Sequence, residues 1–273
     1  SLSSYEESKR RFWIEHGKRC LEIAGAFAEG TGQLCTVNFW MPDGYKDTCV
    51  DTVKHREIMT QALDEIFATA YDRKNVLAAV ESQLFGLGVE SHTVASHEYA
   101  LGYAISRNLR YTLDAGHFHP TEVISAKISA VLQFADQILL HVSRGVRWDS
   151  DHVITLDDEL QRIMDEIVWN RYENRVFIGL DYFDASINRI AAWAVGMRNA
   201  RKAILNACLA PVERIRAAEY GEDFTSRLAL LEDRKTLPFG LVWAYYCESR
   251  GIALDGVWLD EVKAYERTVL SKR

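Results

Sequence analysis

The chain has 273 residues, of which 48% are hydrophobic and 26% charged, and its formal net charge is −7. This length and composition allow one large α/β domain or two smaller ones, with a core that needs no disulfides. The acidic balance and the dispersed lysines and arginines argue against a nucleic-acid-binding surface. No apolar stretch approaches the ~20 residues of a transmembrane helix, so we expect no membrane span.

The cysteines and the amino terminus indicate a cellular compartment. The five cysteines, at positions 20, 35, 49, 208 and 247, are an odd number with no CxxC pair. This pattern is typical of free thiols in a reducing compartment. Residues 1–10 have no apolar core, so we expect no signal peptide there and predict a cytoplasmic protein.

Extended and helical patterns alternate over most of the chain. Strands are predicted to begin near residues 35, 76, 109, 137 and 175. Helices are predicted over residues 6–29, 53–71 and 93–105, from Pro120 as a first helical position, and from the acidic turn at 157–159 to about residue 172. Alternating strand and helix units predict a parallel sheet in an α/β fold.

The pattern changes after residue 187. Residues 188–210 are predicted to form the helix after the last strand, with Asp184 as a helix N-cap nearby. Residues 211–273 read as a helical extension broken at Pro211, Gly221 and Pro238. We therefore predict two domains, a barrel portion over 1–210 and an extension over 211–273. Only five strands are visible, whereas a closed (β/α)8 barrel needs eight, so either three strands are missing or the sheet is open.

Four apolar runs each end in a residue that can bind a metal ion. The runs at 76–80, 111–113, 138–140 and 177–180 lead into Glu81, Asp114, His141 and Asp181. Strands of a parallel barrel are buried on both faces and read as such runs, and their carboxyl ends carry the chemistry of these folds. A single strand-terminal Asp is usually a helix cap, but four such endings in succession predict a cage for a divalent cation.

A second set of donors lies in the adjoining loops. His117 follows Asp114 across Gly116, and Asp149 and Asp151 are two residues apart, so in an extended loop they point the same way. Asp149-Ser150-Asp151 by itself is more typical of a solvated turn. Taken with the first set, these residues predict two cation sites rich in oxygen and imidazole, which suit Mn²⁺, Mg²⁺ or Co²⁺. Two adjacent cations favour a substrate with vicinal oxygens, such as a sugar.

Other motifs favour structural roles. His119 is interpreted as a helix-entry residue, and the histidines at 16, 55, 92 and 97 receive structural or surface roles. Gly86-Leu87-Gly88 lacks the third glycine of a dinucleotide fingerprint. The chain contains no GxSxG elbow and no phosphate-binding GxxxxGK[ST] loop.

Several of these segments resemble the bacterial L-rhamnose isomerases. The resemblance is carried by LDAGHFHPTEVIS at 113–125, HVSR at 141–144, VRWDSDH at 146–152, DASINRIAAW at 184–193, PDG at 42–44 with KD at 46–47, and RLALLE at 227–232. It extends over essentially the whole chain, and motifs of this length are highly specific.

The resemblance implies a xylose-isomerase-like (β/α)8 TIM barrel in a cytoplasmic homotetramer, here represented by five strand–helix units and a helical extension. The implied activity interconverts L-rhamnose and L-rhamnulose through a metal-assisted hydride shift, with Mn²⁺ as cofactor and Zn²⁺, Co²⁺ or Mg²⁺ as other candidates. Carried over by motif, the substrate-holding site is Glu81, Asp114, His141 and Asp181, and the catalytic site is His117, Asp149 and Asp151. Trp40 resembles an apolar wall of the sugar pocket.

The chain departs from the family in two respects. The family has Glu-x-Lys on the strand that carries Glu81, whereas this chain has Glu81-Ser82-Gln83. Gln83 should still face the site, because positions two apart on a strand share a face, but it brings no positive charge to a developing oxyanion. The family's chain also extends upstream of Ser1. The resemblance implies that this upstream part supplies the strands missing here. Two alternatives stay open: a metal- or sugar-binding fragment with impaired catalysis, and a related ketose epimerase.

Overall fold

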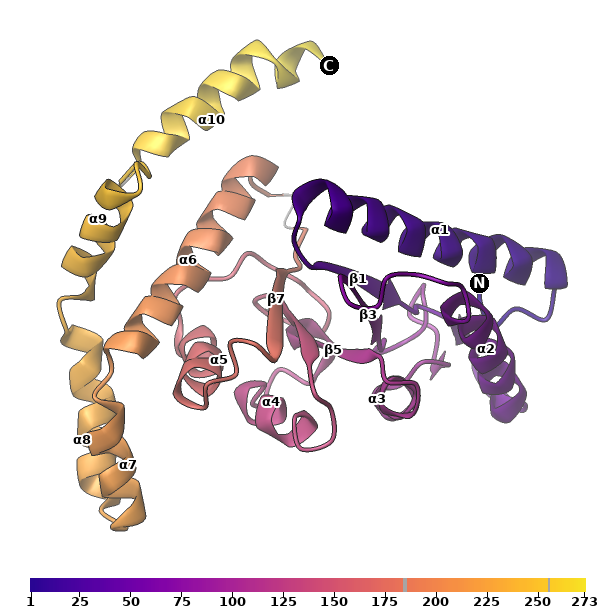
Figure 1. Ribbon diagram of the computed structural model, residues 1–273, viewed down its shortest axis with the longest axis horizontal. Coiled ribbons are helices and arrows are strands. Elements are labelled where there is room, and N and C mark those ends of the chain that lie inside the picture. The colour runs from indigo at the N-terminus through magenta and orange to yellow at the C-terminus, as the bar shows by residue number, and fades with distance from the viewer. Residues whose placement is uncertain (184–185, 255) are drawn as a thin grey trace. The chain divides into compact units, whose positions relative to one another are not determined.

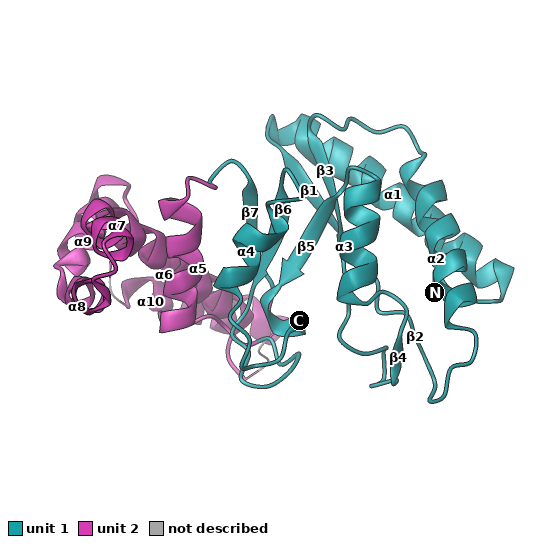
Figure 2. Ribbon diagram, turned by 90° about the horizontal axis from the view of Figure 1, so that it is seen from below, with its two compact units in different colours: residues 1–151, 173–181 teal, residues 152–172, 182–273 magenta. Residues whose placement is uncertain are grey.

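The computed structural model describes residues 1–183, 186–254 and 256–273. The chain divides into two compact units, which are coloured separately in Figure 2. Unit 1 comprises Ser1–Asp151 and Glu173–Asp181, and unit 2 comprises His152–Tyr172 and Tyr182–Arg273. The predicted division at residue 210 stays a prediction.

Unit 1 is built on a curled parallel sheet of five strands (Figure 1). The strands are β1 (Cys35–Trp40), β3 (Val76–Glu81), β5 (Arg110–Asp114), β6 (Ile138–Val142) and β7 (Val176–Leu180), and they lie in this order across the sheet. All four neighbouring pairs are parallel. The five strands predicted from the sequence are therefore confirmed, and the fold is a half-barrel of the TIM type.

The strand register brings the predicted ligands to one edge of the sheet. Every residue of β3 is buried, as expected for a strand covered on both faces. Asp114 is paired directly with His141 across β5 and β6. Val142 is paired with Leu180, so Asp181 follows one position beyond the last pair of β6 and β7. Because all strands run the same way, these carboxyl ends share one rim of the half-barrel.

Helices α1 (Glu7–Thr31), α2 (Thr52–Phe67), α3 (His97–Ser106) and α4 (Ser125–Val131) accompany the strands of unit 1 (Figure 1). Helix α1 contacts β1 and β3, and α3 contacts β3 and β5. Asp51 caps α2 by accepting from the backbone N–H of Lys54, and Ser96 caps α3 by accepting from that of Tyr99. Helix α2 ends four residues before the predicted limit, and α3 begins four residues after its predicted start.

The prediction that Pro120 opens a helix is wrong, because α4 begins only at Ser125. The residues before it form a turn instead. The N–H of Glu122 donates to the carbonyl of His119 at 2.8 Å, and the Glu122 carboxylate accepts from the N–H of His119 at 3.2 Å. The His119 ring also contacts the Thr121 hydroxyl at 2.6 Å. These local bonds satisfy the backbone in a turn and compete with a helical start.

A small antiparallel sheet that the sequence did not predict joins the loops after β1 and β3. It pairs β2 (Gly44–Tyr45) with β4 (His92–Thr93). A Cβ atom on Gly44 would lie 2.2 Å from the Cα atom of Gly86, so only glycine permits this approach of the two loops. Two-residue strands carry no period-2 signal, which explains why the sequence pattern does not reveal them.

Unit 2 is helical in its described residues. It contains α5 (Asp158–Trp169), α6 (Arg189–Leu209), α7 (Val212–Tyr220), α8 (Phe224–Asp233), α9 (Phe239–Ser249) and α10 (Val257–Thr268). The predicted breaks are confirmed, since Pro211 and Pro238 precede α7 and α9 and Gly221 follows α7. Asn188 caps α6, and the predicted cap Asp184 lies outside the described residues. None of the helices described is both long and apolar enough to cross a membrane.

Candidate metal centre

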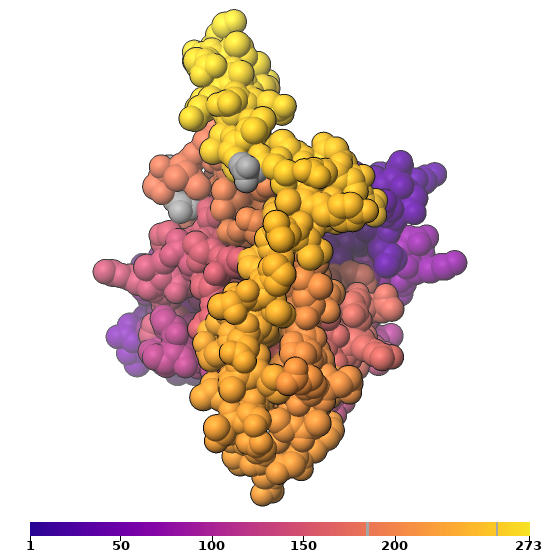
Figure 3. Space-filling model, turned by 90° about the vertical axis from the view of Figure 1, so that its left-hand side faces the viewer, coloured from indigo at the N-terminus to yellow at the C-terminus, as the bar shows by residue number. Residues whose placement is uncertain are grey.

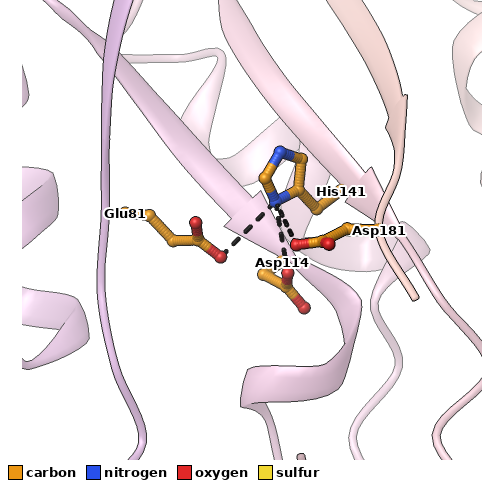
Figure 4. Close-up of side chains that lie close together, drawn as sticks. All are labelled: Glu81, Asp114, His141 and Asp181. Carbon is orange, nitrogen blue, oxygen red and sulfur yellow. Dashed lines mark ion pairs between the residues drawn. The ribbon is translucent and has the colours of Figure 1, made fainter. Parts of the chain in front are cut away.

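The four strand-terminal donors converge at the rim of the half-barrel (Figure 4). One ligand atom from each of Glu81, Asp114, His141 and Asp181 lies within 4.8 Å of the other three. Glu81 and Asp114 are buried, whereas the Asp181 side chain is 49% exposed. The cluster is therefore buried at Glu81 and Asp114 and accessible to solvent at Asp181, which follows β7.

Hydrogen bonds from neighbouring residues hold the two buried carboxylates. The Asn38 side chain on β1 donates to Glu81 Oε2, and the Thr112 hydroxyl donates to Asn38 Oδ1 at 2.7 Å. The N–H of Gly116 donates to Asp114 Oδ1 at 2.6 Å. One oxygen of each carboxylate is thus fixed, and the other faces the centre of the cluster.

His141 Nδ1 faces three carboxylate oxygens at once. It lies 3.0 Å from Asp181 Oδ2, 3.3 Å from Asp114 Oδ2 and 3.5 Å from Glu81 Oε1, as the dashed lines in Figure 4 mark. This buried nitrogen has no partner in hydrogen-bond geometry among the described residues. A single N–H cannot serve three acceptors, whereas a divalent cation accepts one imidazole nitrogen and several carboxylate oxygens. The donor set therefore fits a divalent cation that prefers oxygen and imidazole ligands.

The electrostatics of the cation-free cluster centre on His141. Burial opposes its charged form, but the neighbouring carboxylates of Asp114, Asp181 and Glu81 outweigh burial and raise its pKa to about 12. Burial raises the pKa of Glu81, against the effect of His141. Burial also acts to raise the pKa of Asp114, but the neighbouring His141 and the charges of both histidines lower it overall. His141 is therefore protonated at neutral pH, and a cation bound to Nδ1 would replace this proton.

Gly179 allows the His141 ring to occupy its place. A Cβ atom at residue 179 on β7 would lie 3.0 Å from Cδ2 of His141. His141 is paired with Gly179 in the parallel register of β6 and β7. A larger residue there would press on the ring from the neighbouring strand.

The second predicted set lies next to the first. His117, in the 3-10 turn η1 (Ala115–His117), is buried; its Nδ1 lies 3.6 Å from Glu81 Oε1, and its Nε2 lies 3.3 Å from Asp149 Oδ1. Burial opposes its charge, but the hydrogen bond to Asp149 and the charges of Asp114 and Glu81 raise its pKa to about 9. The Nδ1 atom of this ring also has no hydrogen-bond partner within the described part of the chain.

Asp151 is held separately from Asp149. The Ser143 hydroxyl donates to Asp151 Oδ1 at 3.0 Å, and a Cβ atom on Gly116 would lie 2.2 Å from the same oxygen. Gly116 is therefore required for space beside this carboxylate. Burial, followed by the charge of Asp114, raises the pKa of Asp151 to about 6.

His117, Asp149 and Asp151 do not form a group of mutually close donors like the first four among the described residues. The extended loop expected around Asp149 is also wrong, because Asp149 has a left-handed φ of 51° within a turn. Its N–H donates to the carbonyl of Gly116 at 3.0 Å, which ties this turn to η1. A non-glycine residue in this conformation is costly and is often found at functional sites. The cation role of this set stays a prediction.

Gln83 and Trp40 lie beside the second set. The Trp40 indole N–H donates to Gln83 Oε1 at 3.2 Å, and Gln83 Nε2 donates to Asp149 Oδ2 at 3.3 Å. Gln83 is 4% exposed. Its amide is therefore oriented at both ends and links the indole to a predicted ligand.

Sequence reasoning missed Asn38 and Ser143, which hold Glu81 and Asp151. Asn38 lies on β1, two positions before Trp40. Its side chain reaches Glu81 on the neighbouring strand β3. A polar residue inside a predicted strand next to a ligand-bearing strand was the available signal. Ser143 carried no such signal, because serine is common after strands.

A family model and several known relatives all name the same family for this chain. The family model described as L-rhamnose isomerase (RhaA) matches residues 1–273. An L-rhamnose isomerase of Mannheimia succiniciproducens is 56% identical over the whole chain, which covers 66% of that protein. The corresponding proteins of Rhodopirellula baltica and Pectobacterium carotovorum are 55% and 52% identical over the whole chain, which covers 64% and 65% of them. The chain thus spans slightly less than two thirds of the length of these relatives.

Proposed function

The chain belongs to the L-rhamnose isomerase family, and on this basis we propose that it carries the metal centre of an aldose–ketose isomerase acting on L-rhamnose and L-rhamnulose. The observation that carries the proposal is the convergence of Glu81, Asp114, His141 and Asp181 within 4.8 Å. The partly exposed Asp181 gives a sugar access to this centre from solvent.

Mn²⁺ is the proposed cofactor, held by these four residues, with a second cation held by His117, Asp149 and Asp151. Zn²⁺, Co²⁺ and Mg²⁺ are compatible with the same donors. When bound, divalent cations polarise vicinal oxygens of a sugar and stabilise the negative charge that develops on them. Asn38 would keep the Glu81 carboxylate, and Ser143 the Asp151 carboxylate, oriented toward the bound cations.

The proposed reaction moves a hydride from C2 to C1 of the open-chain aldose, while the proton on O2 is transferred to O1. The product then has a carbonyl at C2 and a hydroxyl at C1, so atoms and charge balance. Trp40 would form an apolar wall of the pocket, and Gln83 would hold Asp149 and donate to the sugar.

A cytoplasmic homotetramer is also proposed. All five cysteines carry free thiols, which supports a reducing compartment. Large apolar side chains are exposed on the carboxyl-terminal helices, which are orange to yellow in Figure 3, and such surfaces favour association with another chain. They include Tyr220, Phe224, Leu228, Leu241 and Tyr245.

The direct test is to incubate the pure chain with Mn²⁺ and L-rhamnose and to measure ketose formation. We expect L-rhamnulose to form, and we expect its formation to stop when the cation is chelated; the same mixture without the chain serves as the blank. Tight Mn²⁺ binding with no product at any cation concentration would refute catalysis and favour a binding function. Gln83 is the observation that favours this second function, because its amide brings no positive charge to the reacting oxygens.

Replacing Gln83 with lysine is expected to raise kcat on the order of 10²-fold, because an ammonium group would stabilise a developing oxyanion. Gln83→Met serves as the matched control, since it fills similar volume without a donor. Both variants are assayed at saturating Mn²⁺ and L-rhamnose. Equal activity of the lysine variant and the original chain would refute the electrostatic argument.

A further inference from the structure

His97 lies outside the donor cluster and contacts two of the segments that carry predicted ligands, the end of β3 and the η1 turn. It is the first residue of α3, and its Nδ1 lies 2.7 Å from the Ser82 hydroxyl and 3.2 Å from that of Tyr111. Its Nε2 lies 2.9 Å from the backbone carbonyl of His117. Ser82 separates Glu81 from Gln83, so one ring joins the end of β3 to the η1 turn.

The partners of the ring determine its protonation. A backbone carbonyl only accepts hydrogen bonds, so Nε2 must carry the proton that it donates to His117. Nδ1 is then the acceptor for the Ser82 hydroxyl. The ring also stacks on Phe118, with centroids 4.1 Å apart and an interplanar angle of 13°. These contacts fix both the tautomer and the plane of His97.

Glu81 and His117 depend on His97 to different degrees. Glu81 is held independently by the Asn38 side chain. The His117 ring contacts Asp149 through Nε2, and its Nδ1, near Glu81, lacks a hydrogen-bond partner in the residues the structure describes. Its orientation therefore relies on the backbone at residue 117, and His97 donates to that backbone.

We propose that His97 is a positioning residue that sets the direction of the His117 imidazole through the His117 carbonyl. This inference rests on the proposed function, because it assigns His97 to the second cation site and leaves the first site unaffected. Partners that orient ligand residues typically account for about 10–100-fold in metal affinity. His97 also borders an outer cavity of about 650 Å³, so a side chain of similar size can be accommodated there.

Two substitutions separate the two hydrogen-bonding ends of the ring. His97→Gln places an amide N–H near the position of Nε2 and keeps the donor to His117. His97→Asn places an oxygen near Nδ1 and loses that donor. We expect His97→Asn to weaken binding of the second Mn²⁺ about tenfold and His97→Gln to restore most of the affinity. Binding of the first Mn²⁺ should stay unchanged in both variants.

The experiment is a calorimetric titration of the full chain with Mn²⁺ alone, accompanied by thermal unfolding of each variant. Ser82→Ala is a milder third variant with an expected loss of at most about threefold, because the Tyr111 hydroxyl still faces Nδ1. Two unchanged binding steps in His97→Asn would overturn the inference, and so would a parallel loss of both steps in both variants. A single binding step in the unsubstituted chain would overturn the second site of the proposed function, and the inference with it.

Discussion

Substitution of His141 by leucine is expected to eliminate measurable isomerisation, with a fall of at least about 10³-fold, and to weaken binding of the first Mn²⁺ by more than about 100-fold. Leucine has a similar volume but no atom that can bind a cation. It also leaves Glu81, Asp114 and Asp181 facing one another without the imidazole that now lies 3.0–3.5 Å from each. Mn²⁺ titration and a ketose assay measure the two effects.

The matched control is His16→Leu, because His16 lies on α1 among exposed residues and outside the cluster. It should leave Mn²⁺ affinity and activity unchanged. Circular dichroism of the cation-free variants shows whether each chain is folded. A folded His141→Leu chain that binds the first Mn²⁺ like the original chain would rule out this cluster as the cation site.

Cation binding at the same site is expected to release a proton near pH 7. The pKa of His141 is about 12 in the cation-free protein, above its ordinary value of 6.5, so the ring is protonated at pH 7. A cation needs the neutral nitrogen and must displace this proton. Affinity should therefore rise about tenfold per pH unit as pH increases, and fall as pH decreases. Calorimetry in buffers of different ionisation enthalpy measures the proton, and no dependence on buffer would contradict the expectation.

The sequence predicted the frame of the fold because its strongest signals are periodic. The buried strands appear as apolar runs, so the starts of β3, β6 and β7 were predicted to within one residue. The predicted limits of α5 and α6 lie close to the observed ones, because the side chains of Asp157 and Asn188 accept hydrogen bonds from the first turns of these helices. The turn at residues 119–122 was misread because side-chain hydrogen bonds, which no periodicity reports, override the preference of proline for a first helical turn.

The sequence predicts the part of the site whose residues directly follow a buried strand. Glu81, Asp114, His141 and Asp181 follow apolar runs, and parallel strands place such ends on the same edge of the sheet. The loop donors were harder, because the φ of Asp149 and its contact with Gly116 are set by tertiary packing. The role of His97 was not predictable, since it depends on Ser82 and His117, which lie 15 and 20 residues away from it in the chain.

Replacing Arg234 with methionine is expected to lower the free energy of unfolding by about 3–5 kcal/mol, because it leaves a buried carboxylate without its partner. Arg234 and Asp165 are 4% and 2% exposed. Nη1 of Arg234 donates to Asp165 Oδ1 at 2.7 Å, and Nη2 donates to Oδ2. Chemical denaturation measures the loss. The pair joins the 3-10 turn η2 (Arg234–Thr236) to α5, so its removal should loosen the connection after α8.

The double variant Arg234→Met with Asp165→Leu tests why the single change is costly. It removes both charges together, so most of the lost stability should return, because the penalty arises from one unpaired buried charge. Gln161 loses its hydrogen bond to Asp165 Oδ1, which is 3.0 Å long, but keeps the one to the carbonyl of Ala203 at 3.1 Å in this background. Lys235→Met is the matched control, because Lys235 forms ion pairs at the surface with Asp158 and Glu232, and its loss should be much smaller. If the double variant is as unstable as Arg234→Met, the cost lies in lost packing against Trp169, whose ring centroid is 4.9 Å from the Arg234 guanidinium, and the unpaired-charge explanation fails.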